Sequence, residues 1–279
     1  MSNEIGLLPT VIEVARIVDI TPRMRRITFA GHGVEVYASD PTRVPNIKLV
    51  FPRPNGELDL PDNDGTGRLR WPDPTVKQFV RTYTVRRLDP VAAEMDIDFV
   101  KHGDEGLASG WAEHAQPGDR IGAAGGGGVV APASDWYLIV GDETALPAIG
   151  RMLERLPEGA RGVAVIEVAD EHEHQELTTP ADIEIRWVHR DGAPAGTTDG
   201  LLDAACAVAV PEGDVKRFAW VSAESRTVRA MRTWLRADGR FDRRSTLVIG
   251  YWHIGMSETG YGRSSDHDRV DDEHDDELS

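Results

Sequence analysis

The amino-acid sequence predicts two domains of different class: an antiparallel β-barrel or β-sandwich, followed by an α/β domain with a parallel sheet. Three observations indicate this. The first half of the chain holds several short β-branched or alternating segments, separated by loops rich in Pro, Gly and Asp. Four consecutive glycines at 125–128 then interrupt the pattern. After them, continuous apolar runs alternate with amphipathic segments, which is typical of parallel strands covered by helices.

The expected strands of the first half are short. Segment 10–20 places Ile12, Val14, Val18 and Ile20 at alternate positions, which is the period of a strand. Further strands are expected at 24–30, 46–51, 79–87 and 95–101, with a long loop at 52–74.

In the second half, the apolar run 136–141 is typical of a buried parallel strand and leads into a helix. We expect Thr144 to cap this helix and Pro147 to lie in its first turn. Further strands are expected at 162–168, 183–188, 217–222 and 245–251, and a second helix begins at Ser225. The predicted organisation is therefore a domain at 1–130, a domain at 131–262 and an acidic tail at 263–279.

Composition excludes several classes of function. The 279 residues carry a formal net charge of −16, which argues against nucleic acid or an anionic membrane as a partner. The single cysteine, Cys206, excludes an internal disulfide and a cysteine-based metal cluster. There is no apolar run of the ~20 residues that a membrane span needs, and the N-terminus lacks the pattern of a signal peptide. We therefore expect a cytoplasmic protein.

The negative charge is concentrated at the C-terminus. From Ser264 onward, eight acidic residues face one basic residue, Arg269, which gives this segment a net charge of −7. A solvated terminal segment explains this composition. A short docking helix or an electrostatic shield over a site is the alternative.

Segment 81–86, Arg-Thr-Tyr-Thr-Val-Arg, is the most informative motif. On a strand, Arg81 and Tyr83 share one face, while Thr84 and Arg86 share the other. An arginine can bind a phosphate bidentately, a tyrosine can stack on a planar ring, and a threonine can hydrogen-bond a ring nitrogen. An ordinary barrel strand with surface arginines is the alternative.

A second motif follows the strand at 95–101. After His102 and Gly103, the small residues Gly106, Ala108 and Ser109 open a helix, and such a helix start exposes backbone N–H groups to a pyrophosphate. No motif places a Ser or Cys nucleophile beside His102, so a local hydrogen bond explains this histidine better than general-base catalysis.

Taken in order, these segments resemble the siderophore-interacting protein family, whose members are FAD-containing ferric-siderophore reductases related to ferredoxin-NADP⁺ reductases. The resemblance covers about residues 10–258. Its motifs are R-x-Y-T-x-R at 81–86, D-F-V-x-H and the following A-S-x-W-A at 98–112, P-G-D-R-I-G at 117–122, V-G-D-E-T-A-L-P-A at 140–148, and G-Y-W at 250–252.

The resemblance implies a Greek-key barrel that holds FAD and a C-terminal domain that docks NADH or NADPH. Arg81 and Ser109 would address the FAD phosphates, Tyr83 would pack on the isoalloxazine, and Thr84 would lie near flavin N5. The other positions implied to bind FAD are Val85, Arg86, Asp98, Phe99, Val100, His102, Gly106 and Ala108.

For the nicotinamide, the resemblance implies a loop in place of a glycine-rich turn, made of Asp142, Glu143, Thr144 and Ala145. An acid at the end of the second parallel strand, here Glu167, would also hydrogen-bond the ribose 2′-OH and repel a 2′-phosphate. We therefore expect NADH to serve at least as well as NADPH. The alternative is a phosphate contact from the arginines of the second helix, at positions 226, 229, 232 and 236.

For the siderophore, the resemblance implies Lys48, Trp252 and His253. Many relatives follow G-Y-W with two basic residues, whereas here His253 and Ile254 follow, which predicts a weaker basic patch. Trp252 has an alternative role as a packing aromatic at the end of the sheet.

The expected function is NAD(P)H-dependent reduction of a ferric-siderophore by a monomer, with no resident metal and no catalytic side chain. Two alternatives remain. One is a reductase of a protein acceptor such as a ferredoxin, against which the acidic charge argues. The other is a siderophore carrier without chemistry.

Overall fold

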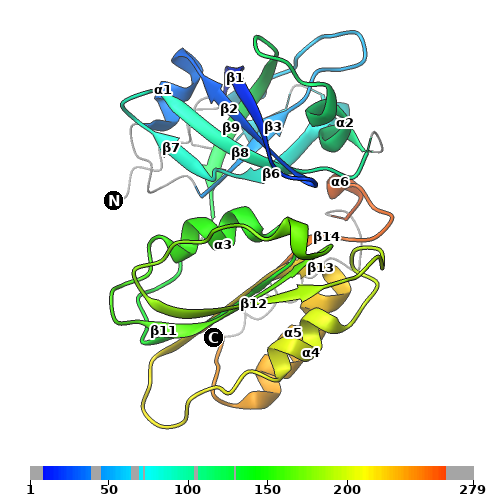
Figure 1. The fold of residues 1–279 in the computed structure, drawn as a ribbon. Coiled ribbons are helices and arrows are strands. Elements are labelled where there is room, and N and C mark those ends of the chain that lie inside the picture. The colour runs from blue at the N-terminus through cyan, green and yellow to red at the C-terminus, as the bar shows by residue number, and fades with distance from the viewer. Residues whose placement is uncertain are drawn as a thin grey trace, which may run out of the picture. The chain divides into compact units, whose positions relative to one another are not determined.

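The computed structural model describes residues 9–38, 45–63, 69–71, 73–103, 106–128 and 130–261. The acidic tail at 263–279 lies outside the described residues. The chain forms two compact units that divide between Val130 and Ala131, and each is described by itself (Figure 1).

Unit 1 is built on an antiparallel sheet whose seven described strands run in the order β6-β3-β9-β1-β2-β8-β7. Its elements are β1 (Thr10–Thr21), β2 (Met24–Ala30), α1 (His32–Ala38), β3 (Asn46–Val50), the short pair β4 (Asp62–Asn63) and β5 (Leu69–Arg70), a 3₁₀ helix (Pro74–Phe79), β6 (Val80–Thr84), β7 (Arg87–Asp89), β8 (Glu94–Val100), α2 (Leu107–His114) and β9 (Arg120–Gly127).

The predicted strand at 79–87 is wrong in its extent, because it is two strands at opposite ends of the sheet order. The N–H of Val85 donates to the carbonyl of Pro45, next to β3, whereas the N–H of Arg86 donates to the carbonyl of Asp96 on β8. The chain therefore changes its partner strand within two residues. Since β6 and β7 are consecutive in the chain yet terminate the sheet order, the sheet curls until its two edges meet.

The alternation predicted for the first strand is correct only as far as Val14. The pairing of β1 with β2 shifts between Val14 and Arg16, which inserts one extra residue into β1. A bulge of one residue exchanges the two faces of a strand beyond it. Ile17 consequently packs against the core, while Val18 is 53% exposed.

The core of unit 1 contains an aromatic group that joins α2 to the sheet. Trp111 of α2 lies against Phe29, Phe51 and Phe99, with ring centroids 6.3, 5.5 and 6.0 Å away. The ring of Tyr83 on β6 lies 4.5 Å from that of Phe99. We call these five side chains the aromatic base, because both β6 and α2 rest on it.

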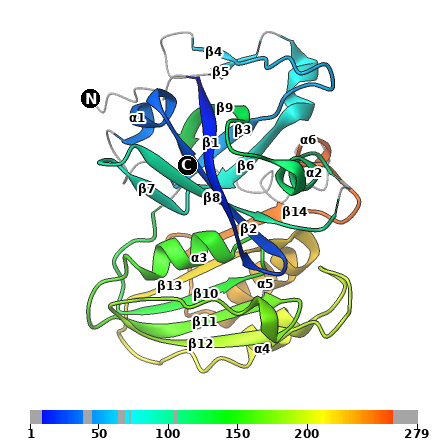
Figure 2. The same ribbon diagram turned by 45° about the horizontal axis from the view of Figure 1, so that its top comes forward.

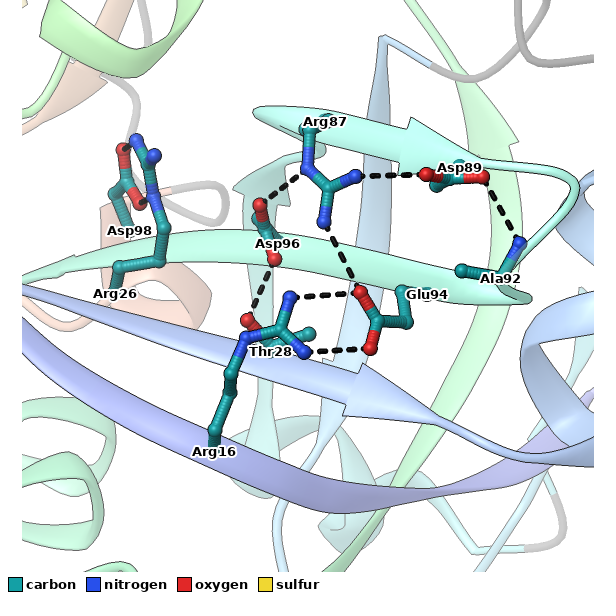
Figure 3. Close-up of polar contacts among 9 residues, drawn as sticks. All are labelled: Arg16, Arg26, Thr28, Arg87, Asp89, Ala92, Glu94, Asp96 and Asp98. Carbon is teal, nitrogen blue, oxygen red and sulfur yellow. Dashed lines mark hydrogen bonds and ion pairs between the residues drawn. The ribbon is translucent and has the colours of Figure 1, made fainter.

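The opposite face of β8 is charged and paired rather than solvated (Figure 3). The Asp96 carboxylate accepts hydrogen bonds from Thr28 Oγ1 at 2.6 Å and from Arg87 Nε at 2.7 Å. Arg26 holds Asp98 with two hydrogen bonds of 2.7 and 2.8 Å. Both aspartates are 4% exposed, so this face of β8 is an internal ion-pair layer.

Unit 2 is a parallel sheet with helices on both faces, which confirms the predicted fold class. Its described strands run in the order β12-β11-β10-β13-β14. In Figures 1 and 2, α3 covers one face and α4 and α5 cover the other. The elements are β10 (Trp136–Gly141), α3 (Leu146–Leu153), β11 (Arg161–Val168), a 3₁₀ turn (Glu171–Glu173), β12 (Asp182–His189), α4 (Gly200–Cys206), β13 (Arg217–Glu224), α5 (Ser225–Asp238), β14 (Thr246–Trp252) and α6 (Glu258–Tyr261).

The continuous apolar runs arise because both faces of this sheet are covered. Leu138 and Val140 of β10 pack toward α4 and α5, and the intervening Tyr137 and Ile139 are also buried. The sequence did not predict α1, α4 or α6. It also did not predict β9, which continues through 125–127, three of the four glycines expected to interrupt the strand pattern. No helix among the described residues is both long and apolar enough to cross a membrane.

The ion-pair layer on β8 yields a test of stability. Asp96→Ala leaves the buried hydroxyl of Thr28 and the guanidinium of Arg87 without their shared acceptor, so we expect the free energy of unfolding to fall by about 2–3 kcal/mol. Urea unfolding followed by circular dichroism measures this change. Asp89→Asn is the matched control, because it removes a carboxylate that pairs with Arg87 nearer to solvent but keeps an oxygen for the N–H groups of Val91 and Ala92. Equal losses in the two variants would contradict the assignment.

Candidate functional site

Strand β6 carries the first group of predicted site residues in unit 1. The Arg81 guanidinium donates from Nη1 to the carbonyls of Gln78 and Val80, at 2.9 and 2.7 Å. Tyr83 and Thr84 are half-buried, and Tyr83 rests on Phe99 of the aromatic base. A half-buried aromatic ring on a rigid support is suited to stacking against a planar ligand.

The start of α2 carries the second group. Ser109 is 2% exposed. Its hydroxyl accepts a hydrogen bond from the N–H of His102 at 3.1 Å and donates to the carbonyl of Gly103 at 2.8 Å. The helical hydrogen bonds begin with the N–H of Gly110, which donates to the carbonyl of Gly106. The N–H groups of residues 107–109 therefore precede that ladder, which is the position from which helix starts bind anions in other proteins.

Gly106 is required by two features of this turn. Its φ of 99° lies in the region that favours glycine. A Cβ atom at this position would also lie 3.2 Å from Cε1 of His102. The turn therefore brings His102 against the backbone at the helix start.

The other predicted residues of unit 1 do not share one face of the sheet, because Asp98 belongs to the ion-pair layer on the face of β8 opposite to Phe99. Val85 and Phe99 are fully buried in the core, and Asp98 is held by Arg26. Arg86 and Val100 are half-buried, and Ala108 is buried. On β3, the Lys48 ammonium donates to Thr82 Oγ1 of β6 at 3.1 Å.

These side chains fit a ligand that combines phosphates with a planar ring. The helix start and an arginine supply donors for anions, and Tyr83 supplies an aromatic surface. The individual contacts of these residues with a ligand remain predictions.

In unit 2, the predicted residues lie at the carboxyl ends of the parallel strands, which we call the carboxyl edge. Open α/β sheets bind their ligands at this edge. Asp142 follows β10 and accepts four hydrogen bonds there. Its Oδ1 accepts from Thr144 N at 2.9 Å and Thr144 Oγ1 at 2.5 Å, and its Oδ2 accepts from Trp252 Nε1 at 2.7 Å and Glu224 N at 3.1 Å.

The prediction that Thr144 caps α3 is wrong. The helix begins at Leu146 after Ala145, and no side chain caps it. The carboxylate of Asp142 instead binds both the N–H and the hydroxyl of Thr144. This tight turn is the form that the predicted loop takes in place of a glycine-rich one.

A second group of ion pairs spans the other half of the carboxyl edge. Arg190, which follows β12, binds Glu143 through both terminal nitrogens, with Nη2 at 2.8 Å from Oε1. Arg190 Nη1 also lies 3.5 Å from the carboxylate of Glu167 on β11, which accepts from Thr198 Oγ1 as well. The Arg190 side chain is only 2% exposed.

Burial governs the electrostatics of these acids. Burial, followed by the charge of Glu143, raises the pKa of Asp142 from 3.8 to about 6, against its hydrogen bonds from Thr144 and Trp252. Burial also raises the pKa of Glu167, while the positive charge of Arg190 opposes that rise. Glu167, predicted to meet a ribose, is 4% exposed and already holds protein partners.

The structure joins two residues that were predicted for different ligands. Trp252, predicted for the siderophore, donates to Asp142, predicted for the nicotinamide. His253 turns toward its neighbour, with Nδ1 at 2.7 Å from the carbonyl of Ile254. This hydrogen bond gives Trp252 a structural contact at the end of the sheet, and its contact with a siderophore stays a prediction.

Three residues of the carboxyl edge were missed in the sequence. Arg190 joins two acids, and Glu224 caps α5 through Oε2, which accepts from Arg226 N at 2.6 Å. The third is Gly196, whose backbone lies so close to Glu224 and Trp252 that an added Cβ would be 2.8 Å from Glu224 Cγ and 3.0 Å from the Trp252 ring. Arg190 and Glu224 each stand at or just after the end of a strand, and this position was the signal that could have found them.

Comparisons with known proteins identify one family over nearly the whole chain. The family model for the siderophore-interacting FAD-binding domain matches residues 13–130, and that for siderophore-interacting protein matches residues 134–255. The ferric vibriobactin reductase ViuB of Vibrio cholerae is 34% identical over 94% of this chain and 96% of its own length. The NADPH-dependent ferric-chelate reductase of Escherichia coli is 30% identical, covering 87% and 92%.

A solved structure gives the same result. The siderophore utilization protein from T. fusca superimposes with a TM-score of 0.81 at 41% identity, over 89% of this chain and 94% of that one.

The buried carboxylate of Asp142 yields a test of pH dependence. Below about pH 4, the group is protonated in both the folded and unfolded states and costs nothing. Between about pH 4 and about pH 6 the unfolded state releases this proton while the folded state keeps it, so stability falls as the pH rises. Above about pH 6 the folded state holds a buried charge that the unfolded state solvates freely, and the loss is complete. We expect this loss, about 2–3 kcal/mol, to be absent in Asp142→Asn.

Guanidinium unfolding of both proteins between about pH 4 and about pH 7 measures the difference. Asp199→Asn, which removes an exposed acid at the same edge, is the control and keeps the wild-type slope. Parallel curves for wild type and Asp142→Asn would contradict a raised pKa of Asp142.

Proposed function

This chain belongs to the siderophore-interacting protein family, and on that premise we propose that it reduces ferric-siderophores to release Fe(II) for iron assimilation, with FAD as the bound carrier and NADH or NADPH as the donor. One observation carries the proposal. Sequence similarity to a named ferric-siderophore reductase extends over 94% of the chain, and so includes both units.

The residues of unit 1 fit FAD. When bound, FAD supplies the exchange between a hydride from a nicotinamide and single electrons for Fe(III). We propose that Arg81 and the N–H groups at the start of α2 hold its phosphates, while Ser109 acts by fixing the turn at His102 and Gly103. Tyr83, supported by Phe99, would orient the planar ring, and Thr84 would lie at its edge.

Release of iron follows from the change in its charge. Hard oxygen ligands hold Fe(III) more tightly than Fe(II), so reduction weakens the complex without a protein acid or base. We propose Lys48, Trp252 and His253 as the siderophore contacts. The ammonium of Lys48 is the group among these that favours an anionic complex.

For the donor, we propose the turn at Asp142, Glu143, Thr144 and Ala145 as the nicotinamide side. The reason for expecting NADH was an acid at the end of the second strand, but Glu167 is buried against Arg190 and Thr198. The Escherichia coli relative is described as NADPH-dependent. We therefore propose that both nicotinamides are accepted and that Glu167 does not choose between them.

Two further properties belong to the proposal. Because NADH and NADPH are produced in the cytoplasm, we place the enzyme there, as a monomer without a nucleic-acid partner. A protein acceptor such as a ferredoxin is disfavoured by the net charge of −16, since ferredoxins are commonly acidic.

The deciding experiment is anaerobic reduction of purified ferric-siderophores, followed with a ferrous trap and run separately with NADH and NADPH. We expect Fe(II) to form with at least one donor. Reduction of a ferredoxin but of no ferric-siderophore would favour a protein acceptor. Binding of the siderophore without flavin bleaching by either nicotinamide would favour a carrier.

Arg81→Ala tests the flavin site. Loss of a charge-assisted contact of about 1.5–3 kcal/mol should leave the purified variant largely without FAD, seen as a lower ratio of flavin to protein absorbance. Arg120→Ala, an exposed arginine paired with Glu13 on the same sheet, is the control and should keep its FAD. A full flavin content in Arg81→Ala would remove Arg81 from the site.

Glu167→Gln tests the choice of donor. Because its carboxylate is turned to Arg190, we expect the ratio of kcat/KM for NADH to that for NADPH to stay within about threefold of wild type. A carboxylate that binds the ribose 2′-OH would instead change this ratio by about tenfold or more when neutralised. Arg226→Ala, assayed alongside, reports whether an exposed arginine of α5 contributes to NADPH.

A further inference from the structure

Two histidines meet beside β12, the outer strand of the unit 2 sheet. His189 ends β12, and His174 follows the 3₁₀ turn after β11. Their Nε2 atoms form a hydrogen bond of 2.7 Å, in which one imidazole donates and the other accepts, and both side chains are exposed. Within the described residues, the functional site and the ion pairs of the carboxyl edge use neither imidazole.

The pair is held in place by a third side chain. The ring of His174 stacks on Trp187 with centroids 4.5 Å apart and an interplanar angle of 17°. Trp187 and His189 are two residues apart on β12, so they lie on the same face of the strand. His174 therefore lies over a strand face that presents an aromatic platform and a second imidazole together.

We propose that His174 and His189 form a binding site for a divalent transition-metal ion, in which each Nε2 supplies one ligand. Neutral imidazole is a preferred ligand of Zn²⁺, Cu²⁺ and Ni²⁺. Among the described residues, no group of three or more His, Cys, Asp or Glu side chains is placed so that it could hold a metal ion. The site is therefore bidentate, and water completes the coordination.

The spacing selects among metals. With metal–nitrogen bonds of about 2.0–2.1 Å, two ligands at a right angle are about 2.9 Å apart, whereas two at a tetrahedral angle are about 3.4 Å apart. Starting from 2.7 Å, the first arrangement needs less separation of the rings, which then turn until both lone pairs meet the metal. Ni²⁺ and Cu²⁺, which favour right angles, should therefore bind more tightly than tetrahedral Zn²⁺.

Protonation competes with the metal, because an imidazole binds a metal only through a nitrogen that carries no proton. The proton that the two Nε2 atoms share in the free protein must therefore leave when the metal binds.

The experiment uses the flavin-loaded protein and Ni²⁺, which is not reduced by flavin or nicotinamide under these conditions. Calorimetry should show that His174→Ala and His189→Ala each weaken Ni²⁺ binding by about tenfold or more, equivalent to 1.4 kcal/mol. His172→Ala is the matched control, because it removes an exposed histidine of the same turn that is not part of the pair. It should bind as wild type does.

Fluorescence gives an independent readout of position. Ni²⁺ should quench part of the tryptophan emission of wild type, and Trp187→Phe should lose that quenching while keeping the calorimetric binding. Equal Ni²⁺ binding by all three histidine variants would overturn the proposal and assign the metal to other groups, such as the tail that contains His267 and His274. Tighter binding of Zn²⁺ than of Ni²⁺ would overturn the proposed geometry. Neither result depends on the reductase activity.

Discussion

The buried carboxylate of Asp142 is the constraint on which the carboxyl edge of unit 2 depends. A carboxylate removed from water needs several donors, and here they come from three strands: Thr144 after β10, Glu224 at the end of β13 and Trp252 at the end of β14. Each of these hydrogen bonds fixes the position at which one strand ends and a loop begins. On the other side, Arg190 does the same for β10, β11 and β12 through Glu143 and Glu167. The five strand ends are therefore tied by two polar centres, Asp142 and Arg190, and Arg190 is bound to the residue next to Asp142, Glu143.

Unit 1 achieves a comparable rigidity with apolar contacts. Trp111 and the phenylalanines beneath it support both α2 and Tyr83. The two elements proposed to hold FAD, α2 and β6, therefore pack on the same core side chains. The ion-pair layer on the reverse of β8 then secures the same strand from its other face. A cofactor site of this kind needs little movement to form, because its supports are core residues.

The sequence was sufficient for the class of each unit, because periodicity reports which faces are buried. Strand β10 was predicted to the residue, since an apolar run between turns has few alternative explanations. The failures were those that depend on distant partners. The bulge after Val14 exchanges Ile17 for Val18 at the core, and it is visible only in the pairing with β2. The break between Thr84 and Arg87 arises because Val85 and Arg86 bond to different strands. Similarly, the motifs identified Asp142 and Trp252 separately, but nothing local could show that they touch.

The acidic turn after β10 also disfavours the binding of a phosphate at the start of α3. In dinucleotide-binding folds with a glycine-rich turn, this helix start is an electropositive hollow that receives a pyrophosphate. Here the Asp142 carboxylate already takes the N–H of Thr144, whereas the neighbouring Glu143 is paired with Arg190. The Asp142 carboxylate thus neutralises the positive end of the helix dipole, and it would repel an incoming phosphate. On the proposal that this turn receives the nicotinamide, the acid disfavours the anionic linker of the donor there, so the uncharged ring is the part that fits.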